Sequence, residues 1–446
     1  MILLKKLSLS VAIACGVASF SQAAEPVGNT LENFLTAAMD YSPSLRAAQE
    51  RWNMGDARID YANGQLLPQV SANATTSDNN REENNSGFEQ EYRGRNMSVQ
   101  LSQVLFNWQA FSGRQQAYLQ ENQFEAEYYA TLASVFTQVA DEYLAVLQAE
   151  DALASINSEL EAITNQVTQI QRMYDLQLAK ITDLYNAQAQ LAAVQTQRVT
   201  AEADLTIATE TLHANTGLGV AGLSRLPEEV RVIPLQGTLE EWLERAAGNN
   251  KRIEASSLAL QVAQKNVSMR QGAYMPRVSL ILQHQTSNVG FQNAPLNSAD
   301  NNYIGIDVSM PLFAGGSNRA LVREAESQRN MAESERQQVS LDVNNRARTA
   351  YYQVKSGESR IAAAKLLAES TVTSYTAMQR GFQLGTETSV NLLNALRDQF
   401  RAQRDLQRSR YDLIRSTLIL EREAGTLTAE DLQQVSNSLN APPATR

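Results

Sequence analysis

The sequence predicts a mainly α-helical chain that also carries four transmembrane β-strands, and three observations support this fold class. Very long segments have helical periodicity without proline, shorter segments alternate apolar and polar residues, and the whole pattern occurs twice. The 446 residues are enough for one large domain or for two to three ordinary ones.

Residues 1–23 have the features of a secretory signal peptide. Lys5 and Lys6 precede an apolar stretch over residues 7–20, and Ala23 provides a small residue for cleavage. The apolar stretch is too short for a membrane-spanning helix. The only cysteine, Cys15, lies inside it in a poor context for lipid attachment, which leaves a lipoprotein as the less favoured alternative. Cleavage at Ala23 would leave no cysteine for a disulfide or a metal site.

The net charge argues against nucleic acid as a partner. The full chain has a formal charge of -10, and removal of the two lysines of the signal peptide makes it -12. An acidic exported protein is a poor candidate for binding nucleic acid. Later stretches are too polar for a transmembrane helix, so strands would have to hold this protein in a membrane.

The mature chain consists of two similar units. An offset of 208 residues places Pro68 beside Pro276, and motifs further along the chain match at nearly the same offset. We predict a first repeat over residues 24–237, a second repeat over 238–432 and a disordered polar tail over 433–446. Each repeat begins with a helix, for which Thr30 and Thr238 are the expected N-caps. The two prolines end these helices and open strands.

Four segments alternate apolar with small or polar residues, as Ile304, Ile306 and Val308 do with Gly305 and Asp307. This pattern is typical of strands with lipid on one side and water on the other. Two hairpins packed on a soluble core are the alternative. We expect polar loops over residues 77–91 and 288–302. The predicted strands are about 67–77, 93–106, 276–288 and 303–313.

A barrel in lipid must close, because an open edge would leave backbone groups unpaired in hydrocarbon. The smallest membrane barrels have about eight strands, whereas one chain supplies four. If the strands cross a membrane, several chains must therefore share one barrel.

The predicted helices are too long for a compact globule. Residues 111–178 would form a rod roughly 100 Å long at about 1.5 Å per residue. Apolar residues recur at steps of three and four, which is typical of a coiled-coil seam. The chain can turn back near residues 177–183 and 385–389. The predicted long helices are about 111–178, 183–215, 316–382 and 389–424.

These motifs together resemble the TolC family of outer-membrane efflux and secretion channels. The resemblance implies a homotrimer with a twelve-stranded barrel in the outer membrane and a helical tunnel through the periplasm. It also implies docking to an inner-membrane pump through a periplasmic adaptor (membrane fusion) protein, contact with outer-membrane lipid, and passive transport without catalysis or a cofactor. The motifs include Leu67-Pro-Gln-Val70, Met275-Pro-Arg-Val278, Met310-Pro-Leu-Phe-Ala-Gly-Gly316, Gly385-Thr-Glu-Thr-Ser-Val-Asn-Leu-Leu-Asn-Ala395 and Ala424-Gly-Thr-Leu-Thr-Ala-Glu-Asp-Leu432.

The resemblance also indicates a periplasmic constriction and gate at the helix tips. Asn391 and Asn394 stand where the best-known members have aspartates, so a cation-concentrating field is not expected there. Asp183 is retained, and Glu387 replaces a basic residue. Lys180 is the remaining candidate partner for Glu387, in a solvated pair that would contribute little stability.

Several residues are expected to form the junctions between strands and helices. Prolines would end or begin strands there, aromatic rings would pack between barrel and tunnel, and two glycines would allow a sharp bend. The junction residues are Pro68, Phe106, Pro276, Pro311, Phe313, Gly315 and Gly316.

The sequence contains no plausible catalytic, cofactor-binding or metal site. His213 and His284 are far apart and neither belongs to a metal-ligand spacing. A periplasmic coiled-coil adaptor or scaffold without a pore would explain the helices but not the strands. An anchored hydrolase would need a nucleophile and a base, which inspection does not find.

Overall fold

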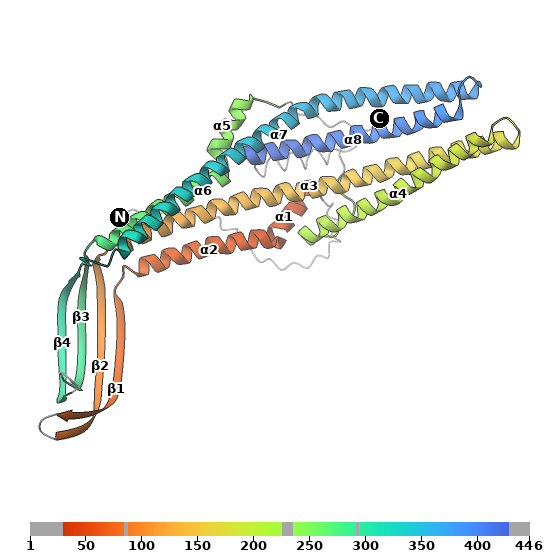
Figure 1. Ribbon diagram of the computed structural model, residues 1–446. Coiled ribbons are helices and arrows are strands. Elements are labelled where there is room, and N and C mark those ends of the chain that lie inside the picture. The colour runs from red at the N-terminus through yellow and green to blue at the C-terminus, as the bar shows by residue number, and fades with distance from the viewer. Residues whose placement is uncertain (1–29, 84–87, 225–234, 291–293, 428–446) are drawn as a thin grey trace, which may run out of the picture.

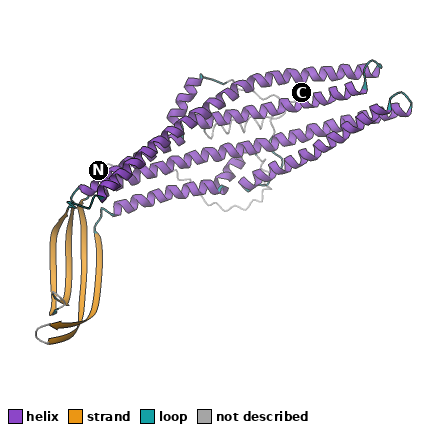
Figure 2. Cartoon of the chain, in the orientation of Figure 1, coloured by secondary structure: helices purple, strands orange, loops and turns teal. Residues whose placement is uncertain are grey.

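The structure is a computed structural model that describes residues 30–83, 88–224, 235–290 and 294–427. The predicted signal peptide and the predicted disordered tail lie outside these residues. The described chain is an elongated molecule with a sheet at one end and long helices that run away from it (Figures 1 and 2). The predicted fold class is confirmed.

The helices occur in two matching sets. The pairs α1 and α5 each have 11 residues, α4 and α8 each have 36, and α3 and α7 have 68 and 67. The internal repeat is therefore visible in the length of each element. The bounds are α1 Leu31–Tyr41, α2 Pro43–Gly64, α3 Trp108–Asp175, α4 Ile181–Thr216, α5 Leu239–Asn249, α6 Lys251–Gln271, α7 Ser317–Gln383 and α8 Ser389–Ala424, with a short 3₁₀ helix at Gly272–Tyr274.

Local capping explains several of these helix starts. The Thr238 hydroxyl accepts a hydrogen bond from the Glu241 amide at 3.3 Å, as a capping residue should. The side-chain Oδ1 of Asn250 accepts one from the Arg252 backbone amide at 2.9 Å and so caps the start of α6. Thr30 precedes α1, but its side chain makes no capping bond. The two repeats therefore begin with different caps.

The four strands form one antiparallel sheet in the order β1-β2-β3-β4. They are β1 Gln69–Glu83, β2 Phe88–Phe106, β3 Arg277–Val289 and β4 Pro295–Ser309. Strands β1 and β4 are the two edges, and each has a neighbour on one side only.

The strands extend further than the alternation of residues predicted. The region around residues 77–91 is mostly paired strand, with Ser77 opposite Gly94 and Glu82 opposite Glu89. Polar contacts replace apolar packing there, since Asn80 Nδ2 donates to Glu89 Oε1 at 2.7 Å. Alternation indicates a sheet with one apolar face, so it does not detect a ladder that has water on both faces. The prediction of long loops was therefore wrong.

The last strand is shorter at its other end than predicted. β4 ends at Ser309, which pairs with Arg277, the first residue of β3. Beyond this pair β3 offers no partner, and Pro311 has no amide hydrogen to donate to a ladder. Residues 310–316 therefore form a connection and not a continuation of the strand.

Helices α2, α3, α4, α6, α7 and α8 form a single layer, which we call the helical wall, and the short helices α1 and α5 pack on it. Near the sheet the order across the wall is α2, α3, α6 and α7. Toward the tips α4 takes the place of α2, and α8 takes the place of α6 (Figure 1). This is also the order of the strands to which these helices connect. The edge of the sheet at β1 is thus continued by α2, and the edge at β4 by α7.

The coiled-coil seam of α3 is buried against its neighbours. Ile156, Ile163 and Ile170 have exposed fractions of 7% or less. They pack against α4 and α8, where Val194 and Leu396 belong to the same cluster as Ile156 and Ile163. The seam predicted from the step of three and four residues therefore joins the two helical hairpins.

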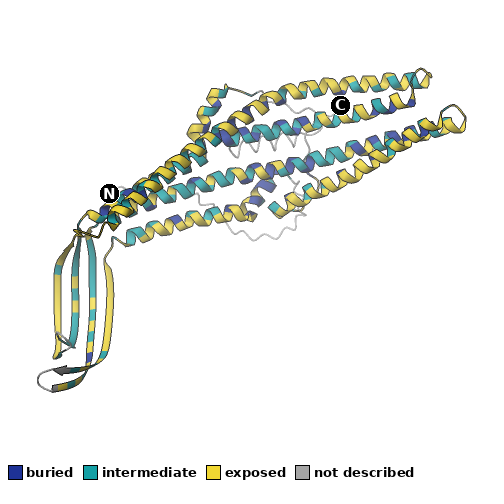
Figure 3. Ribbon diagram, in the orientation of Figure 1, coloured by how far each residue is buried: buried dark blue, intermediate teal, exposed yellow. Residues whose placement is uncertain are grey.

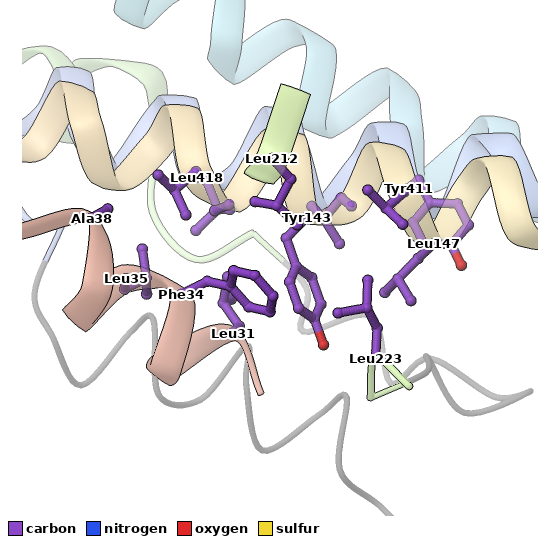
Figure 4. Close-up of a cluster of buried hydrophobic side chains, with 14 of the residues drawn as sticks. Leu31, Phe34, Leu35, Ala38, Tyr143, Leu147, Leu212, Leu223, Tyr411 and Leu418 are labelled. Atoms are coloured by element: carbon purple, nitrogen blue, oxygen red, sulfur yellow. The ribbon is translucent and has the colours of Figure 1, made fainter. Parts of the chain in front are cut away.

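The largest hydrophobic core lies midway along the wall, where α1 packs on α3, α4 and α8. Phe34 and Tyr143 meet edge to face, with 5.7 Å between ring centroids. Leu212 and Tyr411 complete the contact from α4 and α8 (Figure 4). Elsewhere much of the surface is exposed, including the edge strands β1 and β4 and both helix tips (Figure 3). None of the described helices has a segment long and apolar enough to cross a membrane.

Candidate functional site

One face of the sheet is apolar and uncovered. Val70, Leu101, Leu282 and Ile304 lie side by side in one row across the four strands. Val70 is 69% exposed and Ile304 is 72% exposed. A soluble sheet would bury such a row against a core, and here no element of the described part of the chain covers it.

The apolar band runs obliquely across the sheet. Away from the helices, the band reaches Ala74 on β1 and Met97 on β2. On β3 and β4 it stops two rows nearer the helices, at Leu282 and Ile304. Two rows are four residues, or about 13 Å along a strand, and we average this shift over the three interstrand steps of about 4.8 Å from β1 to β4. If the band follows the plane of a membrane, the strands are tilted by about 40° from its normal. Strands of membrane barrels are tilted by about 35–45°.

The opposite face of the sheet is polar. One of its rows consists of Ser71, Gln100, Gln283 and Tyr303. Further along this face, Gln285 Nε2 on β3 donates a hydrogen bond to Asn96 Oδ1 on β2 at 3.0 Å. The sheet therefore has one face suited to lipid and one suited to water.

The predicted junction residues lie between the sheet and the helical wall. Pro68 and Pro276 directly precede β1 and β3, and Phe106 is the last residue of β2. The Phe106 and Phe111 rings are 6.3 Å apart. Phe313 is 88% exposed, so within one chain it does not pack between sheet and helices as expected.

The two glycines at the start of α7 have backbone angles that favour glycine. Gly315 has φ of 60° and Gly316 has φ of 85°, both in the left-handed region. The corresponding join before α3 is made differently, because Asn107 Oδ1 accepts hydrogen bonds from the Gln109 and Ala110 amides. The two repeats thus enter their long helices through different turns.

The candidate gate residues are divided between the two helix tips. Lys180 precedes α4 and Asp183 lies in its first turn, whereas Glu387 lies in the turn before α8, and Asn391 and Asn394 lie in the first two turns of α8. Lys180 and Asn391 are exposed, whereas Asp183, Glu387 and Asn394 are half-buried.

Glu387 has a partner other than the expected one. Its Oε2 accepts a hydrogen bond from Asn391 Nδ2 at 3.0 Å, one helical turn away. Among the described residues of this single chain, Lys180 forms no ion pair with Glu387. The Thr388 hydroxyl caps α8 by accepting from the Asn391 amide at 3.2 Å. Glu387 and Asn391 are therefore held by contacts within the tip of the second repeat.

Sequence reasoning did not find the polar links that join the two hairpins. Arg404 Nη1 on α8 lies 2.5 Å from Glu159 Oε2 on α3, and the Glu159 side chain is 1% exposed. Nearby, the Tyr411 hydroxyl donates to Asp151 Oδ2 at 2.6 Å. A signal for Glu159 exists, since it lies between Ile156 and Ile163 on the α3 seam. Nothing in the sequence indicates its partner.

Two neighbouring titratable groups near the middle of α3 have raised pKa values. Burial raises the pKa of the Glu142 carboxyl, against the opposing effect of hydrogen bonds from Gln138 and Asn215. Burial also raises the pKa of Tyr143 to about 12. Both groups lie in or beside the central core, which is a structural setting.

The two histidines are separate and engaged with polar neighbours. His213 Nδ1 is 2.8 Å from the Leu218 carbonyl oxygen, and His284 Nδ1 is 2.8 Å from Asn302 Oδ1. The described residues contain no group of three or more potential metal ligands.

Comparison with known proteins yields one family for both repeats. The model of the family described as "Outer membrane efflux protein" matches residues 35–218 and 242–426. The outer membrane protein TolC of Vibrio cholerae is 27% identical over 98% of this chain and 98% of its own length. The alkaline protease secretion protein AprF of Pseudomonas aeruginosa is 24% identical over 90% of this chain and 85% of its own.

Solved structures of outer-membrane channels have the same fold. The structure of VceC from Vibrio cholerae superposes with a TM-score of 0.77 at 17% identity, covering 89% of this chain and 96% of that one. The CusC structure gives a TM-score of 0.79 at 16% identity, covering 90% of this chain and 92% of that one.

Proposed function

The chain belongs to the outer membrane efflux protein family, and on this premise we propose how its sheet, wall and helix tips act together as an exit duct. The protein is an outer-membrane duct for efflux or type I secretion, and it extends into the periplasm. TolC-like channels are homotrimeric and work with periplasmic adaptors and inner-membrane pumps. The resemblance to the TolC family is thus confirmed.

The open four-stranded sheet is the observation that carries the proposal. Both of its edges are unpaired within one chain, and one face carries an oblique apolar band. In lipid these edges must pair, so β1 of one copy pairs with β4 of the next. The helical wall continues both edges, which brings α2 and α4 of one copy beside α7 of the next.

Three copies give a barrel of twelve strands. With an interstrand spacing of about 4.8 Å and a tilt of about 40°, its backbone radius is about 12 Å. Such a barrel is wide enough for an open lumen, and the polar face with Ser71 and Gln283 lines it. In each copy the first repeat supplies β1 and β2 and the second repeat supplies β3 and β4, so the two repeats alternate around the ring.

Passage is passive and is gated at the periplasmic tips. The candidate constriction residues are Lys180, Asp183, Glu387, Asn391 and Asn394, which remain a proposal. The hydrogen bond between Glu387 and Asn391 supports a tip in which amides and not a carboxylate ring face the pore. A pair between Lys180 of one copy and Glu387 of another is possible only in the assembled ring.

The family is a channel family and not an enzyme class. We propose that this chain carries out no catalysis, in line with its lack of a recognisable nucleophile and base. A scaffold without a pore is disfavoured, because it would not need the uncovered apolar row that includes Val70 and Ile304.

The candidate cargo classes are drugs, polypeptides and metal ions, and the names of relatives favour the first two. One relative is named for alkaline protease secretion, and the matched family is named for efflux. A deletion strain complemented by the wild-type gene would be tested for drug sensitivity and for its secreted proteins. Restored drug tolerance supports efflux, and restored secretion supports the polypeptide use.

The duct itself is tested by purification and electrical recording. We expect an oligomer that migrates as one band until heated, and steady conductance in planar lipid bilayers. A purified chain that remains monomeric in detergent and gives no conductance would refute the proposal.

A further inference from the structure

Helix α8 carries aspartates and arginines that alternate in sign at steps of three and four residues. The order is Asp398, Arg401, Asp405, Arg408 and Asp412. Such steps place all five on one face of a helix. We call this face the charge ladder.

The charge ladder is in contact with solvent. Arg401 Nε is 4.0 Å from Asp405 Oδ2, and their side chains are 76% and 59% exposed. Arg408 Nε is 3.8 Å from Asp412 Oδ2, with 70% and 38% exposed. Exposed pairs of this kind contribute little to stability. Helix stability is therefore a poor explanation for a pattern that extends over four turns.

The position of α8 restricts where the charge ladder can point. The helix packs against α7 on one side and α3 on the other. Its exposed face therefore looks toward one of the two surfaces of the helical wall, the lumen or the periplasm. Asn391 and Asn394 lie one heptad before Asp398 and Arg401, on the same face. If these asparagines form the constriction, the ladder lies in the lumen directly beyond it.

We propose that the charge ladder lines the tunnel as stacked rings of alternating sign and makes the duct nearly non-selective between cations and anions. This inference rests on the proposed function and on the proposed constriction. Successive rings are about 5 Å apart at 1.5 Å per residue. This spacing is shorter than the Debye length of about 10 Å at 0.1 M salt, so neighbouring rings cancel in the lumen.

The test measures the reversal potential of single channels across a KCl gradient. Arg401→Gln with Arg408→Gln leaves the aspartate rings uncompensated and should make the duct cation-selective. Asp398→Asn with Asp405→Asn should shift the reversal potential in the opposite direction. Each double variant neutralises two rings, and for each ring of three charges about 10 Å from the ion at 0.1 M salt the cation-to-anion permeability ratio should change about fivefold.

Two controls make the result specific. Arg401→Lys with Arg408→Lys keeps the charges and should keep the wild-type reversal potential. Arg198→Gln removes an arginine of α4 that also pairs with an acid four residues on, since Arg198 lies 2.8 Å from Glu202. This variant should change the cation-to-anion permeability ratio much less.

The outcomes separate this inference from the function on which it rests. A wild-type protein without conductance refutes the duct. Conductance with reversal potentials that do not move in opposite directions refutes the lumenal ladder. An equal shift for Arg198→Gln also refutes it, because total charge would then explain the selectivity.

Discussion

The ion pair between Arg404 and Glu159 is expected to hold the two helical hairpins together. The two residues come from α8 and α3, and the Glu159 side chain is almost completely buried, at 1% exposed. Arg404→Met would leave this carboxylate without its cation. Loss of one partner of a buried pair costs about 3–5 kcal/mol, and the 22% exposure of the Arg404 side chain places the expected cost near 3 kcal/mol.

The free energy of unfolding would be measured by urea titration of the detergent-solubilised protein, followed by helical circular dichroism. Adding Glu159→Met to Arg404→Met should restore most of the loss, because two apolar side chains of similar volume replace a buried pair at little cost. Arg397→Met is the matched control on the same helix. Arg397 is 3.4 Å from Asp398 with both side chains about half exposed, so its loss should cost less than about 1 kcal/mol.

A different result would refute this account of the hairpin contact. If Arg404→Met unfolds within about 1 kcal/mol of the wild type, the pair contributes no more than a surface pair does. If the double variant is as unstable as the single one, the loss comes from packing and not from the buried charge.

Three further predictions concern the constriction, the turns and a half-buried acid. The double variant Asn391→Asp with Asn394→Asp should form channels that Mg²⁺ blocks, because carboxylate rings concentrate cations, whereas Mg²⁺ should not block wild-type channels. Equal block of the variant and the wild type in single-channel recordings would contradict this. Gly385→Ala should cost about 1–2 kcal/mol in urea titrations, as a strained left-handed position does. Gly425→Ala should cost clearly more, since its Cβ would lie 2.5 Å from backbone atoms; equal losses would oppose this. Burial raises the pKa of Glu142 above its ordinary 4.5, so the native state binds more protons and stability should fall as pH rises from there toward neutrality. Glu142→Gln should flatten that dependence, and an unchanged slope would assign it to another group.

The sequence alone determined the duplicated plan of this protein. Prolines at positions 68 and 276 and the period of the apolar residues are local or repeating signals, so they can be read without knowledge of the packing. Strand alternation also indicated which residues form the lipid-facing row. It failed beyond Ser77 on β1, because a ladder with water on both faces needs no alternation.

Only the tertiary structure decided the order of the helices and the contacts between them. Placing α8 between α7 and α3 brings Arg404 to Glu159 across 245 positions of sequence. It also leaves the face with Arg401 and Arg408 uncovered, which the repeat of charges did not reveal. A partner so distant leaves no local signature, because it depends on which helices pack side by side and on their rotation about their axes.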